Sequence, residues 1–163
     1  MPVVHMRIDN RLIHGQVTVA WVSALGADHM IVCNDKVARD PIQKMMLPQA
    51  ARGVKTSVLS VDDTVAYAGS PEAAREKIFV IAKFPTDALE LLEKGLQPKE
   101  INVGNQAPIP GTKYKMVLKS VAATPEDAEV YRKIAARGYK LTCKMMPTDP
   151  AEDFIEVLAR KGL

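Results

Sequence analysis

Short apolar runs alternate with longer amphipathic stretches along the whole chain. The runs are rich in β-branched residues, and several are almost continuously apolar, as in strands that are covered on both faces. They occupy residues 3–8, 30–33, 55–59, 78–82, 101–103, 114–118 and 139–145. Strands that alternate with helices predict an α/β fold with a mostly parallel sheet. We expect one domain over residues 1–163, because no low-complexity linker or internal repeat divides the chain.

Several helix boundaries are marked by polar, proline and glycine residues. A polar N-cap followed by proline satisfies free backbone amides and places the proline where its missing N–H costs nothing. This pattern predicts four helix starts, at Asp40-Pro41, Ser70-Pro71, Thr124-Pro125 and Asp149-Pro150. Three of them carry an acid or amide at the third helical position, which resembles a capping box: Gln43, Asp127 and Glu152. Gly53, Gly95 and Gly138 predict helix ends.

The first predicted helix directly follows the first strand and a short polar loop. Its apolar positions are Val17, Ala20, Trp21, Ala24 and Leu25, which share one helix face. Gly26 then predicts the helix end. Residues 9–15 therefore form a strand-to-helix loop, and ligands of open α/β sheets collect where such loops lie.

That loop contains a histidine, an arginine and a glycine just before a helix N-terminus. Free amides and the helix dipole at such an end favour an anion, typically a phosphate. The Arg11 guanidinium can grip two phosphate oxygens, and neutral imidazole makes His14 a candidate nucleophile. Gly15 lets a tetrahedral group approach the backbone. The loop predicts a phosphoryl-accepting histidine. The alternative is an ordinary loop histidine beside a solvated arginine.

The other histidines and the cysteines carry weaker signals. His5 lies in the first predicted strand and His29 at the edge of the second, where packing or solvent exposure is the expected role. Cys33 and Cys143 show no CxxC or metal-ligand spacing, so two buried free thiols are expected. No dense cluster of acids and histidines calls for a metal. We therefore expect no metal and no cofactor.

Composition narrows the class of protein further. Hydrophobic residues make up 47% of the chain and charged residues 25%, which excludes a disordered protein. No apolar run approaches the roughly 20 residues of a membrane span. Residues 1–7 lack the features of a signal peptide, so a cytoplasmic location is expected. The net charge of +3 is scattered, which argues against nucleic acid as a partner.

The stretch from Arg7 to Val17, RIDNRLIHGQV, resembles the signature of a transport family. This is the IIB component of the mannose/fructose/sorbose family of the bacterial sugar phosphotransferase system. The similarity extends along the chain, through residues 32–38, 101–105 and 147–150. The sequences of the last two segments, INVGN and PTDP, resemble the N-acetylgalactosamine and hexosamine branch.

The resemblance implies a fold, an activity and partners. The fold is a doubly wound sheet of about seven strands, with helices on both faces and a single edge strand reversed. A phosphoryl group arrives from the phosphorylated IIA component, rests on His14, and passes to a sugar held by the membrane IIC and IID components. The protein is then peripheral to the membrane permease. Formation of a homo-oligomer is left open.

The resemblance also assigns residues of the loop. Arg11 is the phosphate-binding arginine, and Asp9 occupies the acidic position of the motif, where we infer that it organises the loop. Asn10, Gly15 and Gln16 complete the candidate phosphate-binding loop.

Two segments of the chain depart from the family pattern. Many members carry arginine three residues before the proline that is Pro147 here, whereas this chain has Lys144. Lysine keeps the charge but loses the fork geometry, so Lys144 is a candidate second phosphate ligand. After Asn105 the chain continues Gln106-Ala107, where relatives often carry Met and His. The role of the loop at residues 104–106 is left open.

Two other functions fit the same architecture. A nucleotide enzyme is disfavoured, because the nine glycines form neither GxGxxG nor GxxxxGK[ST]. A non-enzymatic anion-binding or regulatory module would use the same loop without covalent chemistry. Only a IIB component should acquire an acid-labile phosphate.

Overall fold

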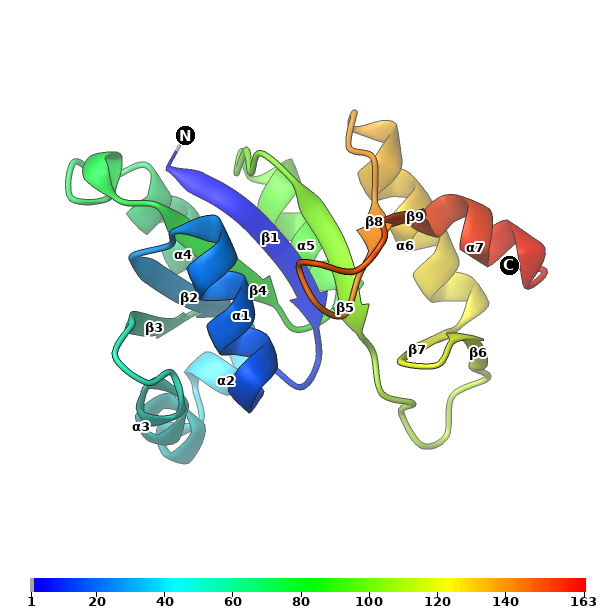
Figure 1. The fold of residues 1–163 in the computed structure, drawn as a ribbon, viewed down its shortest axis with the longest axis horizontal. Helices are drawn as coiled ribbons and strands as arrows, with labels where there is room; N and C mark the ends of the chain where they lie inside the picture. The colour runs from blue at the N-terminus through cyan, green and yellow to red at the C-terminus, as the bar shows by residue number, and fades with distance from the viewer. Residues whose placement is uncertain (1) are drawn as a thin grey trace.

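The computed structural model describes residues 2–163 and has a seven-stranded central sheet (Figure 1). The strand order is β3-β2-β4-β1-β5-β8-β9, and all neighbours are parallel except β8 and β9. The strands are β1 (Val3–Asp9), β2 (His29–Cys33), β3 (Lys55–Leu59), β4 (Ile78–Ala82), β5 (Ile101–Asn105), β8 (Thr142–Cys143) and β9 (Glu152–Asp153). The expected doubly wound, mostly parallel sheet with one reversed edge strand is confirmed.

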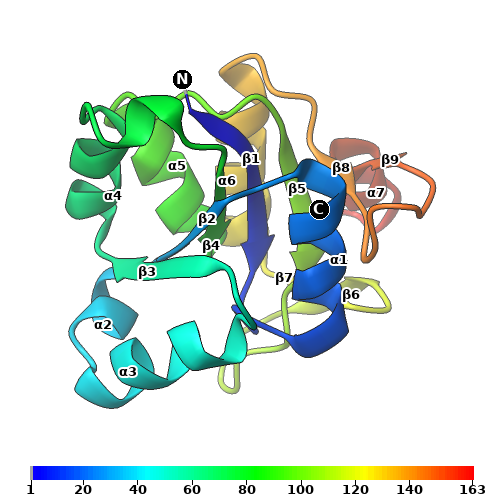
Figure 2. The same ribbon diagram turned by 60° about the vertical axis from the view of Figure 1, so that its left-hand side comes forward.

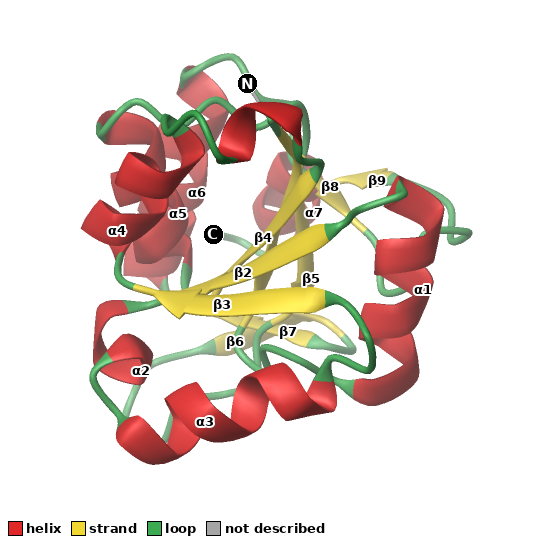
Figure 3. Cartoon of the chain, turned by 90° about the vertical axis from the view of Figure 1, so that its left-hand side faces the viewer, coloured by secondary structure: helices red, strands yellow, loops and turns green. Residues whose placement is uncertain are grey.

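Helices cover both faces of this sheet (Figure 3). They are α1 (Gly15–Leu25), α2 (Asp35–Ala38), α3 (Pro41–Ala50), α4 (Val61–Ala68), α5 (Pro85–Glu93), α6 (Pro125–Ala136) and α7 (Phe154–Arg160). Helices α4, α5 and α6 lie on one side of the sheet and α1 on the other, as Figures 2 and 3 show. None of these helices is long and apolar enough to span a membrane, within residues 2–163.

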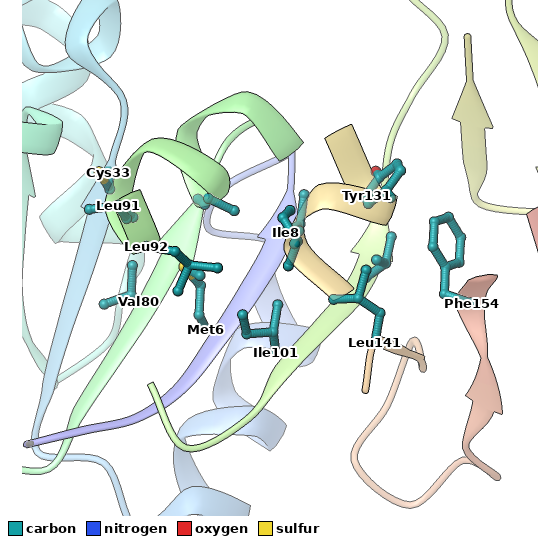
Figure 4. Close-up of a cluster of buried hydrophobic side chains, with 14 of the residues drawn as sticks. Met6, Ile8, Cys33, Val80, Leu91, Leu92, Ile101, Tyr131, Leu141 and Phe154 are labelled. Carbon is teal, nitrogen blue, oxygen red and sulfur yellow. The ribbon is translucent and has the colours of Figure 1, made fainter. Parts of the chain in front are cut away.

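The core consists of two apolar clusters, one for each face. The larger joins β1, β4 and β5 to α5 and α6, with Met6, Leu91 and Tyr131 fully buried (Figure 4). The smaller joins Trp21 of α1 and Phe79 of β4 to Leu12 of the first loop. The central strands are therefore covered on both sides, which explains their continuous apolar sequence.

Two of the four predicted helix starts are confirmed. Asp40 accepts hydrogen bonds from the amides of Ile42 and Gln43 at the start of α3. Thr124 and Asp127 form a reciprocal capping box at the start of α6. These bonds satisfy amides that have no partner inside a helix.

The other two predicted starts are wrong. After Ser70-Pro71 there is only the short 3-10 helix η1 (Ala73–Arg75), because Glu76 turns into extended backbone and its carboxylate bonds His29. At Asp149-Pro150 no helix begins, because Asp149 accepts from the amide of Met146 instead. Glu152 lies in β9, and α7 starts after it, with Asp153 as its N-cap.

Two predicted strands also need correction. The strand expected at residues 139–145 is only Thr142–Cys143, because the carbonyl of Lys144 is taken by the Arg7 and Asn102 side chains. The run at 114–118 forms β6 (Lys115–Leu118), which pairs with β7 (Val121–Ala123) in a separate two-stranded sheet. The seventh strand of the main sheet is therefore β9.

Helix α1 ends at Gly26 as expected, but its buried face differs from the predicted one. Trp21 is buried, whereas Ala24 is exposed. Thr18 is buried in place of an apolar residue, because its hydroxyl accepts a hydrogen bond from the His14 amide. Both cysteines are buried and free, which confirms the expected state of the thiols.

Candidate functional site

The loop between β1 and α1 lies at the carboxyl edge of the central sheet (Figure 1). Leu12 and Ile13 are buried in the smaller core cluster and hold the loop against the fold. Leu12 adopts a left-handed backbone, with φ of 65°, which is unfavourable for a bulky side chain. Burial of these two side chains offsets that strain and leaves the next residue, His14, at the surface.

His14 is the N-cap of α1, and its side chain is exposed and makes no capping bond. Its backbone amide donates to the Thr18 hydroxyl at 2.8 Å, which fixes the backbone at this point. The amides of Gly15 and Gln16, both exposed residues, have no hydrogen-bond partner among residues 2–163. An exposed imidazole therefore stands beside two free amides and the positive end of a helix dipole.

Gly15 allows the backbone conformation with which helix α1 begins. It has a positive φ of 45°, which favours glycine, and a Cβ there would meet no atom within 4 Å. The space around Gly15 is therefore open, as the approach of a tetrahedral anion requires.

Asp9 joins the loop to two arginines. Its carboxylate accepts from the Arg11 amide at 2.9 Å, from Arg11 Nη2 at 3.2 Å and from Arg7 Nε at 3.3 Å. The Asp9 side chain is 2% exposed and that of Arg11 is 23% exposed. Arg11, three residues before His14 in the loop, is thus held near the surface by a buried carboxylate.

Arg7 is a residue of the site to which the sequence analysis gave no role. Its Nη1 donates to the Lys144 carbonyl at 2.9 Å, and its guanidinium lies 5.1 Å from the centre of the Trp21 ring. Gly104 makes room for it, because a Cβ there would lie 2.0 Å from Arg7 Cζ. Burial lowers the pKa of Arg7, and the Asp9 carboxylate opposes that shift. The sequence did hold one signal for this role, because a charged residue within a largely apolar predicted strand needs a buried partner.

Asn10 ties this loop to the segment after β5. Its side chain donates to the Ala107 carbonyl at 3.1 Å and accepts from the Ala107 amide at 2.9 Å. The backbone amide of Asn10 donates to the backbone carbonyl of Asn105 at 3.1 Å. Ala107 takes part in these contacts only through its backbone. The difference from the family pattern at this position therefore does not remove them. Gln106 is buried and donates to the Lys83 carbonyl.

Lys144 and Met145 bring the chain beyond β8 to the same place. The Trp21 indole donates to the Met145 carbonyl at 2.9 Å, and Arg11 Nη2 lies 3.3 Å from the Met145 sulfur. Lys144 supplies its carbonyl to Arg7, while its ammonium donates to the Pro147 carbonyl at 3.4 Å. Among residues 2–163 that ammonium donates to no acceptor of the β1–α1 loop. Its role as a phosphate ligand stays a prediction.

The remaining histidines and the thiols are enclosed by the fold. His5 bonds Asn102 and stacks on Trp21, and His29 bonds Ser57 and Glu76. Burial lowers the pKa of both histidines. Burial also raises the pKa of the Cys33 thiol to about 12 and that of Cys143 to about 11. Within residues 2–163, no group of three or more His, Cys, Asp or Glu is arranged to hold a metal.

The fold and the loop define a mostly parallel α/β domain that presents an exposed histidine at a helix N-terminus with free amides. The chain belongs to a family within this class, the sorbose subfamily IIB components of the phosphotransferase system (PTS), whose family model matches residues 3–163. The resemblance found in the sequence is thereby confirmed.

Three relatives illustrate this membership. The IIB domain of the Klebsiella pneumoniae sorbose permease has a crystal structure that is 34% identical, with a TM-score of 0.92 and 98% of each chain covered. An Escherichia coli N-acetylgalactosamine-specific IIB component is 34% identical, over 96% of this chain and 98% of that protein. The E. coli mannose-specific EIIAB component is 33% identical, over 94% of this chain and 47% of that protein. These similar identities do not single out one sugar branch.

Proposed function

We propose that His14 accepts a phosphoryl group from a phosphorylated IIA component and passes it to a sugar held by the membrane IIC and IID components. The observation that carries this proposal is an exposed histidine at a helix N-terminus with two free amides, in the same loop as Arg11. Membership of the IIB family supplies the class of reaction. The mannose-specific relative is named EIIAB, which supports a IIA component as the donor. The transfer then takes place at the cytoplasmic face of the permease.

The chemistry consists of two substitutions at phosphorus. A ring nitrogen of His14 attacks the phosphorus, a new P–N bond forms, and the bond between the phosphorus and the donor residue of the IIA component breaks. A sugar hydroxyl oxygen then attacks, the bond to His14 breaks, and the hydroxyl proton leaves to solvent. Such transfers depend mainly on positioning and on charge stabilisation. The free amides of α1 and the Arg11 guanidinium supply positive charge at the transferred group.

Other nucleophiles of the chain are less suited to this role. His5 is 3% exposed and His29 is fully buried, so a donor protein cannot reach either ring. Cys33 and Cys143 are also buried, and their raised pKa values keep the thiols protonated at neutral pH. Accessibility therefore favours His14.

The test is phosphorylation by phosphoenolpyruvate, the general PTS proteins and a IIA component. We expect one acid-labile phosphate per chain, located on His14 by peptide mapping. The His14→Gln variant should take none while keeping the circular dichroism spectrum and melting temperature of the parent. Stoichiometric labelling of that variant would exclude His14. Absence of any acid-labile phosphate on the parent would instead favour the non-enzymatic anion-binding module.

A further inference from the structure

Two arginines share the Asp9 carboxylate, and only one of them is accessible. Arg7 Nε and Arg11 Nη2 lie 3.3 Å and 3.2 Å from the same oxygen, Oδ2. The Arg7 and Asp9 side chains are each 2% exposed, whereas that of Arg11 is 23% exposed. A buried carboxylate that loses its only cation is strongly destabilised. The second arginine therefore determines whether Arg11 is free to leave Asp9.

Arg7 is fixed on all sides. One nitrogen bonds Asp9, another bonds the Lys144 carbonyl, and the guanidinium lies against the Trp21 ring. The remaining side is closed by the backbone of Gly104, whose missing Cβ would lie 2.0 Å from Arg7 Cζ. Arg7 therefore stays beside Asp9 and cannot reach a ligand at His14.

Arg11 has the opposite properties. Apart from Asp9, its side chain contacts the Met145 sulfur through Nη2 and the Asn105 side-chain amide through Nε, each at 3.3 Å. Its side chain is partly exposed, and it belongs to the same loop as His14 and the free amides of α1. An anion bound at those amides would attract the guanidinium away from Asp9.

We propose that Arg7 is a positioning residue, which keeps Asp9 charge-compensated so that Arg11 can leave it and bind the phosphoryl group on His14. Arg7 itself touches no phosphate. This proposal rests on the proposed function of His14 and adds a division of labour between the two arginines. Without Arg7, Asp9 has Arg11 as its nearest cation and holds it.

A double-mutant cycle tests this division of labour. Arg7→Met should slow phosphorylation by phospho-IIA about tenfold. The effect should fall on kcat and not on KM for phospho-IIA, because the docking surface is unchanged. Asp9→Asn in the Arg7→Met background removes the charge that retains Arg11, so part of the rate should return. A merely structural Arg7 predicts a further loss in the double variant, and that result would overturn the proposal.

A glycine substitution perturbs Arg7 without changing any charge. The Cβ of Gly104→Ala would occupy the space of the guanidinium and push it from Asp9, so this variant should reproduce the loss of rate. Gly69→Ala is the matched control, because its Cβ would meet nothing nearer than 3.7 Å. A parent-like rate for a folded Gly104→Ala protein would contradict the proposal.

Nuclear magnetic resonance on the parent protein avoids any loss of folding. The Nε–H signals of the two arginines are assigned with Arg7→Lys and Arg11→Lys. Phosphorylation of the protein, or saturation with inorganic phosphate, should shift the Arg11 signal and leave the Arg7 signal in place. The reverse pattern would overturn the proposal. If the parent takes no phosphoryl group, the proposed function fails, while the titration with inorganic phosphate still shows whether Arg11 moves and Arg7 does not.

Discussion

The Asp9 carboxylate controls the geometry of the loop because it bonds both the backbone and the side chain of Arg11. Its Oδ1 accepts from the Arg11 amide at 2.9 Å, and its Oδ2 accepts from the Arg11 guanidinium at 3.2 Å. The loop conformation and the direction of the arginine are therefore set by one side chain. We therefore expect Asp9 to stabilise the folded loop, and Arg11 to supply positive charge without contributing much to folding.

Replacement of Arg11 tests that expectation. Arg11→Gln removes the partly exposed cation of the loop and leaves the buried Arg7–Asp9 pair in place. Loss of a charge contact made in the transition state costs about 2.7–4 kcal/mol in comparable anion sites. We expect phosphoryl transfer to slow about a hundredfold or more with little change in melting temperature. An unchanged single-turnover rate would remove Arg11 from the mechanism.

A pair of substitutions at Lys144 tests the second predicted cation. If the ammonium leaves the Pro147 carbonyl for the phosphoryl group, Lys144→Gln should slow transfer, whereas Lys144→Arg should preserve or improve it. A solvated lysine predicts that both variants match the parent. Transfer rates measured with purified phospho-IIA separate the two outcomes. Equal rates for Lys144→Gln and the parent would exclude Lys144 as a phosphate ligand.

At the scale of the elements, the N-cap of α6 gives a measurable contribution to stability. Thr124→Ala removes the hydroxyl that accepts from the Asp127 amide, which should cost about 1 kcal/mol of unfolding free energy. For a domain of this size the melting temperature should fall by about 2–4 °C. Thr124→Ser keeps the hydroxyl and should retain most of the stability. Equal melting temperatures for the Ala variant and the parent would contradict the assigned cap.

Elements whose signals are local could be predicted from the sequence. The cap at Asp40, the helix end at Gly26 and the loop around His14 follow from neighbouring residues, and the structure contains all three. The run at 114–118 does form a strand, but its apolar pattern could not show that it pairs with β7 outside the main sheet. Asp149 has the sequence of a cap, yet its carboxylate bonds the Met146 amide instead.

The same limit applies to the candidate site. Arg11 and His14 are close in sequence, so their juxtaposition could be inferred from spacing. The role of Arg7 depends on the Lys144 carbonyl, 137 positions away, and on the missing side chain of Gly104. Neither neighbour is visible in the local pattern around Arg7. Sequence reasoning therefore identified the candidate loop but not the buried Arg7 that supports it.

For the whole molecule, two buried histidines make stability depend on pH. Burial lowers the pKa of His5 and His29 below their ordinary value of 6.5. Between the lowered value and 6.5 the unfolded chain binds more protons than the folded one, so stability rises with pH there. The stability is therefore greatest, with respect to these two histidines, above pH 6.5, and it decreases as the pH falls below 6.5.

Thermal unfolding measures this dependence. We expect a lower melting temperature at about pH 5 than at about pH 7.5. His5→Gln, which keeps a polar side chain next to Asn102, should show a smaller difference between the two pH values than the parent. A parent melting temperature that is the same at both pH values would show that the histidines do not control stability.

The hydrogen bonds from Arg7 and Trp21 to the backbone of Lys144 and Met145 also have a consequence for biosynthesis. They span 137 and 124 positions, so strand β1 and helix α1 leave the ribosome long before their partners are made. Contacts this distant form late, because the intervening chain must be ordered first. A nascent chain thus contains His14 before the Arg7 guanidinium can bond the Lys144 carbonyl. We therefore expect the arrangement of Arg7 and Arg11 around Asp9 to be complete only after β8 has joined β5.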